Sequence, residues 1–168
     1  MKKLSVMLFA VVLSFSAFSQ GKDVVDIAIG SADHTTLVAA VKAADLVTTL
    51  KGKGPFTVFA PTNAAFDKLP AGTVDGLLKP ENKAQLAKIL TYHVVSGNLD
   101  AAAVMAAIKS GNGKAVLTTV SGGKLTGSID NGKVKLTDES GKSAFVTAAD
   151  LKGTNGVVHV IDGVLLPK

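Results

Sequence analysis

Residues 57–66 of the chain read Thr57-Val58-Phe59-Ala60-Pro61-Thr62-Asn63-Ala64-Ala65-Phe66. The aromatic and β-branched residues at 56–60 have a proline on each side, which predicts a strand that runs into a turn. Thr62 or Asn63 can then cap a short helix that carries Phe66 on its apolar face. The segment therefore predicts a strand that is followed at once by a helix.

Two further segments have similar character. Residues 155–162 read Asn155-Gly156-Val157-Val158-His159-Val160-Ile161-Asp162. Residues 157–161, like 56–60, form a run that is apolar on both faces, which suits a central strand covered on both sides. Residues 89–95 read Ile89-Leu90-Thr91-Tyr92-His93-Val94-Val95, and there the pattern changes from helix to strand.

The remaining pattern is helical first and β afterwards. Two helices are expected before the first strand, and Asp33, Asn82 and Asp100 are each placed to cap a helix. The helix after Asp100 is expected to turn Met105 inward.

From residue 114 onwards short strands dominate, with Asn131-Gly132 as a hairpin turn and the last strands at 144–147 and 157–161. Helices that are followed by hairpins predict an α+β fold with a mainly antiparallel sheet rather than alternating βαβ units.

Composition limits the class of protein. The 168 residues suit one domain, and 47% hydrophobic residues are enough for a packed core. The chain has no cysteine, which excludes disulfides, thiolate metal sites and a cysteine nucleophile. All 18 basic residues are lysine against 13 acidic ones, and this small, dispersed excess without arginine does not favour nucleic-acid binding.

The N-terminus is typical of an export signal. Lys2 and Lys3 precede an uncharged run from Leu4 to Phe18, which as a helix would span about 22 Å. That is short of the bilayer core of about 30 Å. We expect residues 1–19 to be a cleaved secretory signal peptide of bacterial Sec type, with cleavage after Ser19 or Gln20. Residues 20–168 are expected to be a single domain.

Few residues of the sequence could catalyse a reaction or bind a nucleotide or a metal ion. The segment Ser140-Gly141-Lys142-Ser143 mimics the end of a phosphate-binding loop, but Leu136 stands where that loop needs its first glycine, so a polar turn is the favoured interpretation. An acid–base enzyme would have to use His34, His93 or His159 with a nearby aspartate.

We expect His93 and His159 to be buried imidazoles bonded to backbone carbonyls rather than metal ligands. His34 is expected to be neutral, either at the surface or hydrogen-bonded. Asp150 and Asp162 are expected at strand ends as capping or turn residues. We therefore expect no metal and no cofactor.

The three quoted segments, in their order and spacing, resemble the fasciclin (FAS1) domain family over about residues 22–168. The resemblance implies a β-wedge of mainly antiparallel strands flanked by several short helices. It also implies that residues 57–66 and 155–162 contribute neighbouring core strands, so that these signatures are mainly scaffold.

The resemblance further implies a non-catalytic adhesion or interaction module that is secreted, at the cell surface or in the periplasm. Its expected partner is a cell-surface or matrix protein, a polysaccharide or an envelope component. In animal relatives a Tyr-His segment and an Asp-Ile segment are linked to integrin binding, and here Tyr92-His93 matches the first, whereas Asp150-Leu151 keeps only part of the second.

Candidate adhesion contacts are therefore Tyr92, His93, Asp150 and Leu151. Burial of Tyr92 would instead assign it to folding. Two alternatives stay open, a small periplasmic ligand carrier or His/Asp acid–base enzyme, and a purely structural envelope module.

Overall fold

The structure, a computed structural model, describes residues 21–168. The predicted signal peptide and its cleavage site lie outside the described residues. The helices are α1 (Val24–Ile29), η1 (Ala32–His34), α2 (Thr35–Ala43), α3 (Val47–Leu50), α4 (Asn63–Asp67), α5 (Thr73–Leu77), η2 (Pro80–Asn82), α6 (Lys83–Tyr92) and α7 (Ala101–Ser110). The strands are β1 (Phe56–Pro61), β2 (Val94–Ser96), β3 (Lys114–Thr118), β4 (Lys124–Asp130), β5 (Lys133–Thr137), β6 (Ser143–Gly153) and β7 (Gly156–Ile161).

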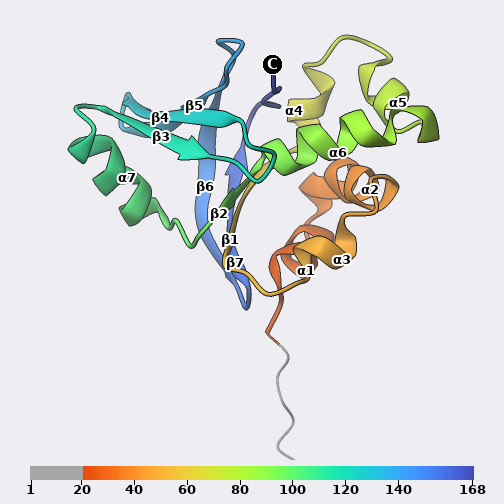
Figure 1. Cartoon of the computed structure of the whole chain (residues 1–168), viewed down its shortest axis with the longest axis horizontal. Coiled ribbons are helices and arrows are strands. Elements are labelled where there is room, and N and C mark those ends of the chain that lie inside the picture. The colour runs from red at the N-terminus through yellow and green to blue at the C-terminus, as the bar shows by residue number, and fades with distance from the viewer. Residues whose placement is uncertain (1–20) are drawn as a thin grey trace, which may run out of the picture.

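The strands of this part of the chain form one 7-stranded sheet in the order β2-β1-β7-β6-β5-β4-β3. Neighbouring strands are antiparallel except for β1 and β7. The two edge strands meet where Val95 bridges Thr119. In Figure 1 helices α1 to α6 lie together on one side of β1 and β7, whereas α7 lies beside β3 and β4. The predicted α+β fold with a mainly antiparallel sheet is confirmed.

The two signature strands lie side by side at the centre of the sheet. β1 and β7 are parallel and in register from Phe56↔Gly156 to Pro61↔Ile161. Every residue of β7 is buried, which explains why its sequence is apolar at successive positions. Gly156 permits the approach of the two strands, because a Cβ at this position would collide with the backbone of Phe56.

Of the residues expected to cap helices, only some make the capping hydrogen bond. Thr62 and Asp100 cap α4 and α7 through bonds from Ala65 N (3.2 Å) and Ala103 N (2.8 Å). The prediction that Asp33 caps a helix is wrong, whereas Asn82 occupies the N-cap position of α6, as predicted, but without a capping bond from its side chain. Asp33 lies inside η1, where it makes no capping bond, and the Asn82 side chain donates to the Gly76 carbonyl at 2.8 Å instead.

Two other expectations about the helices need correction. A helix, α1, begins at Val24 although no helix was expected there, and Asp23 and Asp26 form its capping box. Met105 is 36% exposed, because the apolar stripe of α7 that faces β3 and β4 is centred on Val104 and Ile108.

The core has two main parts. One fills the space between the helices and the β1–β7 half of the sheet, and the other fills the wedge between the two halves of the sheet, where Phe59, Leu125 and Leu136 are buried. Each large side chain of this kind contributes about 1.5 to 3 kcal/mol to folding. No helix in residues 21–168 is long and apolar enough to cross a bilayer.

The segment that resembles a phosphate-binding loop is a turn between β5 and β6, as predicted. The buried Asp138 organises it, because its Oδ1 accepts from the backbone N–H groups of Ser140 and Lys142, both at 2.9 Å. Its Oδ2 accepts from Leu166 N at 2.9 Å, which ties the C-terminal segment to the turn. The turn is thus structural.

Candidate functional site

Tyr92, a candidate contact, is buried completely at the end of α6. Its hydroxyl donates to the Lys124 carbonyl at 2.7 Å and accepts from Glu139 N at 3.2 Å. Gly123 lies against the ring, where a Cβ would come within 2.5 Å of it. Tyr92 therefore joins α6 to two hairpins, and its side chain is not available to touch a partner.

His93 is buried beside it at the junction of α6 and β2. Its Nδ1 lies 2.8 Å from the Ile89 carbonyl, and its Nε2 accepts from Leu165 N at 3.0 Å. A carbonyl requires Nδ1 to carry the proton, so the neutral Nδ1–H tautomer satisfies both bonds. Burial is the main cause that lowers the pKa of His93 from 6.5 to about 4. The ring is a neutral structural group, and it too is removed from the surface.

His159 is held in the same manner. Its Nε2 lies 2.7 Å from the Leu99 carbonyl, its Nδ1 accepts from Asp150 N at 3.3 Å, and its ring stacks on Phe59 at 5.6 Å. The predicted environment, a buried imidazole bonded to a backbone carbonyl, is confirmed for both His93 and His159.

Asp150 and Leu151 lie at the surface on a double irregularity of β6. The prediction that this strand ends near residue 147 is wrong, because β6 continues to Gly153 through register shifts between Val146 and Ala148 and between Ala148 and Leu151. Asp150 has a φ of 61°, which is unusual for a residue other than glycine. These irregularities interrupt the pairing with β7, and residues 147–152 are exposed.

The Asp150 side chain also has a bracing role. Its Oδ1 accepts from the N–H of Ala101, the first residue of α7, at 2.8 Å. Asp150 is therefore a capping residue, as expected, but for a helix about fifty residues earlier. Leu151 is 38% exposed beside it, so both residues lie at the surface, and their role as contacts stays a prediction. Asp162 accepts from Phe145 N at 2.8 Å and closes the far end of the β6–β7 pair.

The geometry required for an acid–base site is not assembled by the described residues. His34 is buried rather than at the surface, with Nδ1 2.8 Å from Ser31 Oγ, and burial lowers its pKa. In residues 21–168 the three histidines bond backbone groups or a serine hydroxyl and no carboxylate. In the same residues no three His, Asp or Glu side chains are grouped to hold a metal ion.

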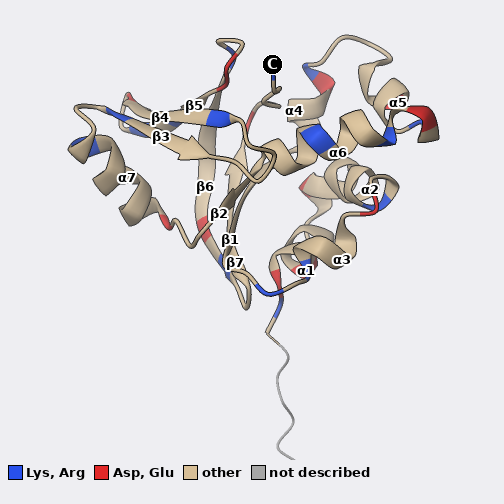
Figure 2. Cartoon of the chain, viewed as in Figure 1, with Lys and Arg blue, Asp and Glu red and all other residues tan. Residues whose placement is uncertain are grey.

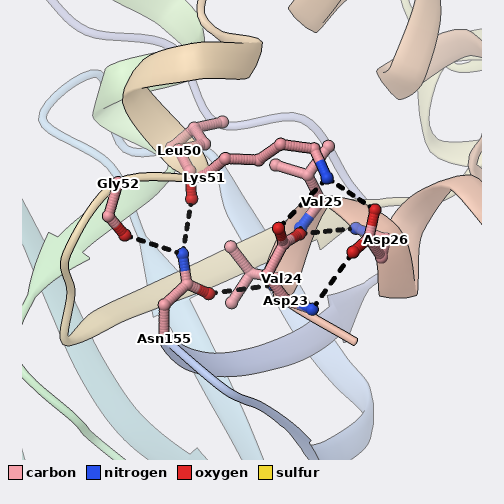
Figure 3. Close-up of polar contacts among 8 residues, drawn as sticks. All are labelled: Asp23, Val24, Val25, Asp26, Leu50, Lys51, Gly52 and Asn155. Atoms are coloured by element: carbon pink, nitrogen blue, oxygen red, sulfur yellow. Dashed lines mark hydrogen bonds and ion pairs between the residues drawn. The ribbon is translucent and has the colours of Figure 1, made fainter. Parts of the chain in front are cut away.

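Asn155, the first residue of the second signature, joins three segments that are far apart in the sequence (Figure 3). Its Nδ2 donates to the carbonyls of Leu50 (2.7 Å) and Gly52 (3.0 Å), and its Oδ1 accepts from Val24 N (3.0 Å). The β6–β7 hairpin is thereby fixed to α1 and to the loop after α3.

An ion pair supports the same junction. Lys51 Nζ lies 3.1 Å from Asp23 and 2.6 Å from Asp26 (Figure 3). The contact with Lys51 is the main cause that lowers the pKa of Asp26, and the same contact raises the pKa of Lys51. The sequence of residues 51–55 holds no local signal that the hairpin at 153–156 packs against them, because the two segments are about a hundred residues apart.

The chain matches the fasciclin domain family over residues 32–167, and it belongs to that family. The protein sll1483 from Synechocystis sp. is 51% identical over 156 residues, which are 93% of this chain and 79% of that protein. The transforming growth factor-beta-induced protein ig-h3 from Sus scrofa is 40% identical over 144 residues, which are 86% of this chain but only 19% of ig-h3.

The solved structure of a FAS1 domain pair from the insect cell adhesion molecule fasciclin I has the same fold, with a TM-score of 0.63. The match has 21% sequence identity and covers 77% of this chain and 43% of that one. The fold expected from the three signature segments is therefore confirmed by a family match and by a structural match.

Proposed function

We propose that this protein is an exported, non-catalytic interaction module that binds a partner at the cell surface or in the surrounding matrix. The observation that carries the proposal is the arrangement of its family signatures. Internal hydrogen bonds hold the buried side chains of Tyr92, His93 and His159. By contrast, the bulged strand carries Asp150 and Leu151 at the surface. Family membership supports the proposal, and so does the adhesion role stated for insect fasciclin I.

The contact surface we propose is the bulge at Asp150–Leu151 together with the start of α7. Helix α7 fixes the bulge through the bond from Ala101 N to the Asp150 carboxylate. The bond from Asp150 N to His159 Nδ1 fixes the backbone of the same residue. A partner therefore meets a preorganised surface, and less conformational entropy is lost on binding. Leu151 supplies a partly exposed apolar side chain that a partner could cover.

The uncharged N-terminal run supports export, and its cleavage remains part of the proposal. The partner is a surface or matrix protein or a polysaccharide. An acid–base enzyme has less support, because the histidines of the described residues have no carboxylate partner.

The test uses the full chain, expressed with its leader, purified after export and labelled with a fluorophore. We expect saturable binding to at least one of intact bacterial cells, isolated surface polysaccharide and matrix protein, with heat-unfolded protein as the control. Absence of saturable binding to all three preparations would contradict the proposal.

A further inference from the structure

A cleft with a volume of about 580 Å³ lies at the end of the molecule formed by the β6–β7 hairpin. Its walls are the loop between α3 and β1 (residues 51–55), the hairpin (residues 152–157) and Asn98, from the connection between β2 and α7. This volume falls within the range of about 300 to 1,000 Å³ that is usual for small-ligand sites. The cleft is thus large enough for one or two sugar units and too small for a folded protein surface.

The charge of the cleft is positive. Lys51, Lys53 and Lys152 line it, and its lining contains no carboxylate. Figure 2 shows basic segments close together here, on the α3–β1 loop and on the end of β6. Asp23 and Asp26 hold Lys51, but within the described residues neither Lys53 nor Lys152 has a carboxylate within 4.0 Å. Two exposed cations are therefore free to pair with a ligand.

Neutral hydrogen-bonding groups complete the lining. Asn98 and Thr154 are exposed in the cleft, and their side chains make no hydrogen bond to another described residue. They can bond hydroxyl groups. The lining contains no aromatic side chain, so it offers no surface on which the bases of a nucleic acid could stack.

The walls of the cleft are fixed before any ligand arrives. The three bonds of Asn155 hold the hairpin against the loop that carries Lys53. Gly54 lies so close to the Asn155 carbonyl that a Cβ would collide with it. The backbone segments that carry Lys53 and Lys152 are therefore held in place by the fold rather than by the ligand, which favours binding.

We propose that this cleft binds an anionic polysaccharide, with Lys53 and Lys152 paired to its acidic groups and Asn98 and Thr154 bonded to its hydroxyls. The inference rests on the interaction role proposed above, and it names the ligand class. Lys152 directly follows Leu151 on β6, so the cleft and the proposed contact surface share this strand, with the two side chains on its opposite faces.

The test measures affinity for alginate oligosaccharides, which carry carboxylates, for dextran sulfate and for uncharged dextran. The variant Lys53→Gln/Lys152→Gln is compared with the control Lys124→Gln/Lys142→Gln, which removes the same charge. Lys142 adjoins the opposite end of β6, about 30 Å from the cleft at strand geometry. Circular dichroism melting checks that each variant is folded.

We expect alginate, dextran sulfate or both to bind more tightly than dextran and to weaken as salt is added. The cleft variant should lose at least tenfold in affinity, and the control should stay within twofold of the wild type. The polymer that binds more tightly identifies the acidic group as carboxylate or sulfate.

Equal losses in the two variants, or no loss in the cleft variant, would overturn the inference. Tighter binding of double-stranded DNA with the same dependence on Lys53 and Lys152 would also overturn it. Binding to cells without binding to either anionic polymer would refute the cleft proposal alone. Absence of binding to the polymers and also to cells, surface polysaccharide and matrix protein would contradict the proposed function as well.

Discussion

The buried, neutral His93 makes the stability of the protein depend on pH in a way that can be calculated. Its pKa is lowered to about 4 in the folded protein, mainly by burial, against the opposing effects of the Ile89 carbonyl and Asp138. In the unfolded chain it returns to about 6.5. Between these values the unfolded state binds more protons, so stability is complete above pH 6.5 and falls as the pH is lowered towards 4.

The two pKa values set the magnitude. The contribution of His93 to the free energy of unfolding should fall by about 2 kcal/mol between pH 7.5 and pH 5, and by about 3 kcal/mol in all by pH 4. Protonation must break the bond from Leu165 N to Nε2, because a charged imidazole has no acceptor. The break of this bond is the part of the loss that belongs to His93, whereas burial of His34, whose pKa is also lowered, adds a separate part of the same sign.

The assay is urea unfolding at several pH values between 4.5 and 7.5, with His93→Gln beside the wild type and His34→Gln as a control. The part of the pH dependence that disappears in His93→Gln, and not in the control, belongs to His93. Should His93→Gln not fold, NMR titration of the wild-type ring replaces it, and we expect no protonation above pH 5. A wild-type ring that titrates near pH 6.5, or equal pH slopes in wild type and His93→Gln, would refute this reasoning.

Three further substitutions test the polar network. Tyr92→Phe leaves the Lys124 carbonyl and the Glu139 N–H without their partner, so the free energy of unfolding should fall by about 1 to 3 kcal/mol in chemical unfolding. A loss near zero would mean that water replaces the hydroxyl. Asn155→Asp replaces the amide N–H donors by a carboxylate oxygen that faces two carbonyl oxygens, so this variant should be less stable than Asn155→Ala. The reverse order of stability in thermal melts would count against the bonds described. Asp150→Asn keeps an acceptor for α7 and tolerates the positive φ, so its free energy of unfolding should change by less than about 0.5 kcal/mol. Asp150→Ala should lose about 1 kcal/mol or more. Equal stabilities of the two variants would exclude the capping role.

The features that were predictable from the sequence depend on neighbouring residues or on the family resemblance. Thr62 and Asp100 cap helices because each side-chain oxygen accepts from a backbone N–H only three residues further along the chain. The Asn131-Gly132 turn has positive φ at both residues, as the hairpin requires. The pairing of β1 with β7 was expected only because of the resemblance, since nothing local relates strands about a hundred residues apart.

The features that were missed depend on distant partners. Asp150 holds its positive φ through bonds with Ala101 and His159, so the continuation of β6 through it could not be inferred from residues 144–147. The burial of Tyr92 depends on hairpins that lie at least thirty residues further along the chain.

The cleft was missed for the same reason. Lys53 and Lys152 are brought together by the bonds of Asn155, and in the sequence each is only one lysine among 18. A charge count gives the number of lysines and says nothing about which of them share a surface.

One binding comparison separates the scaffold from the contact surface most directly. Leu151 is 38% exposed on the proposed surface, and Ile129 is 43% exposed on β4, outside it, so Leu151→Ser and Ile129→Ser are matched changes at similar exposure. Binding of the exported protein to intact cells is measured for both variants and the wild type. We predict that Leu151→Ser weakens binding at least fivefold and that Ile129→Ser leaves it within twofold of wild type; unchanged binding by folded Leu151→Ser would contradict the assignment of this surface.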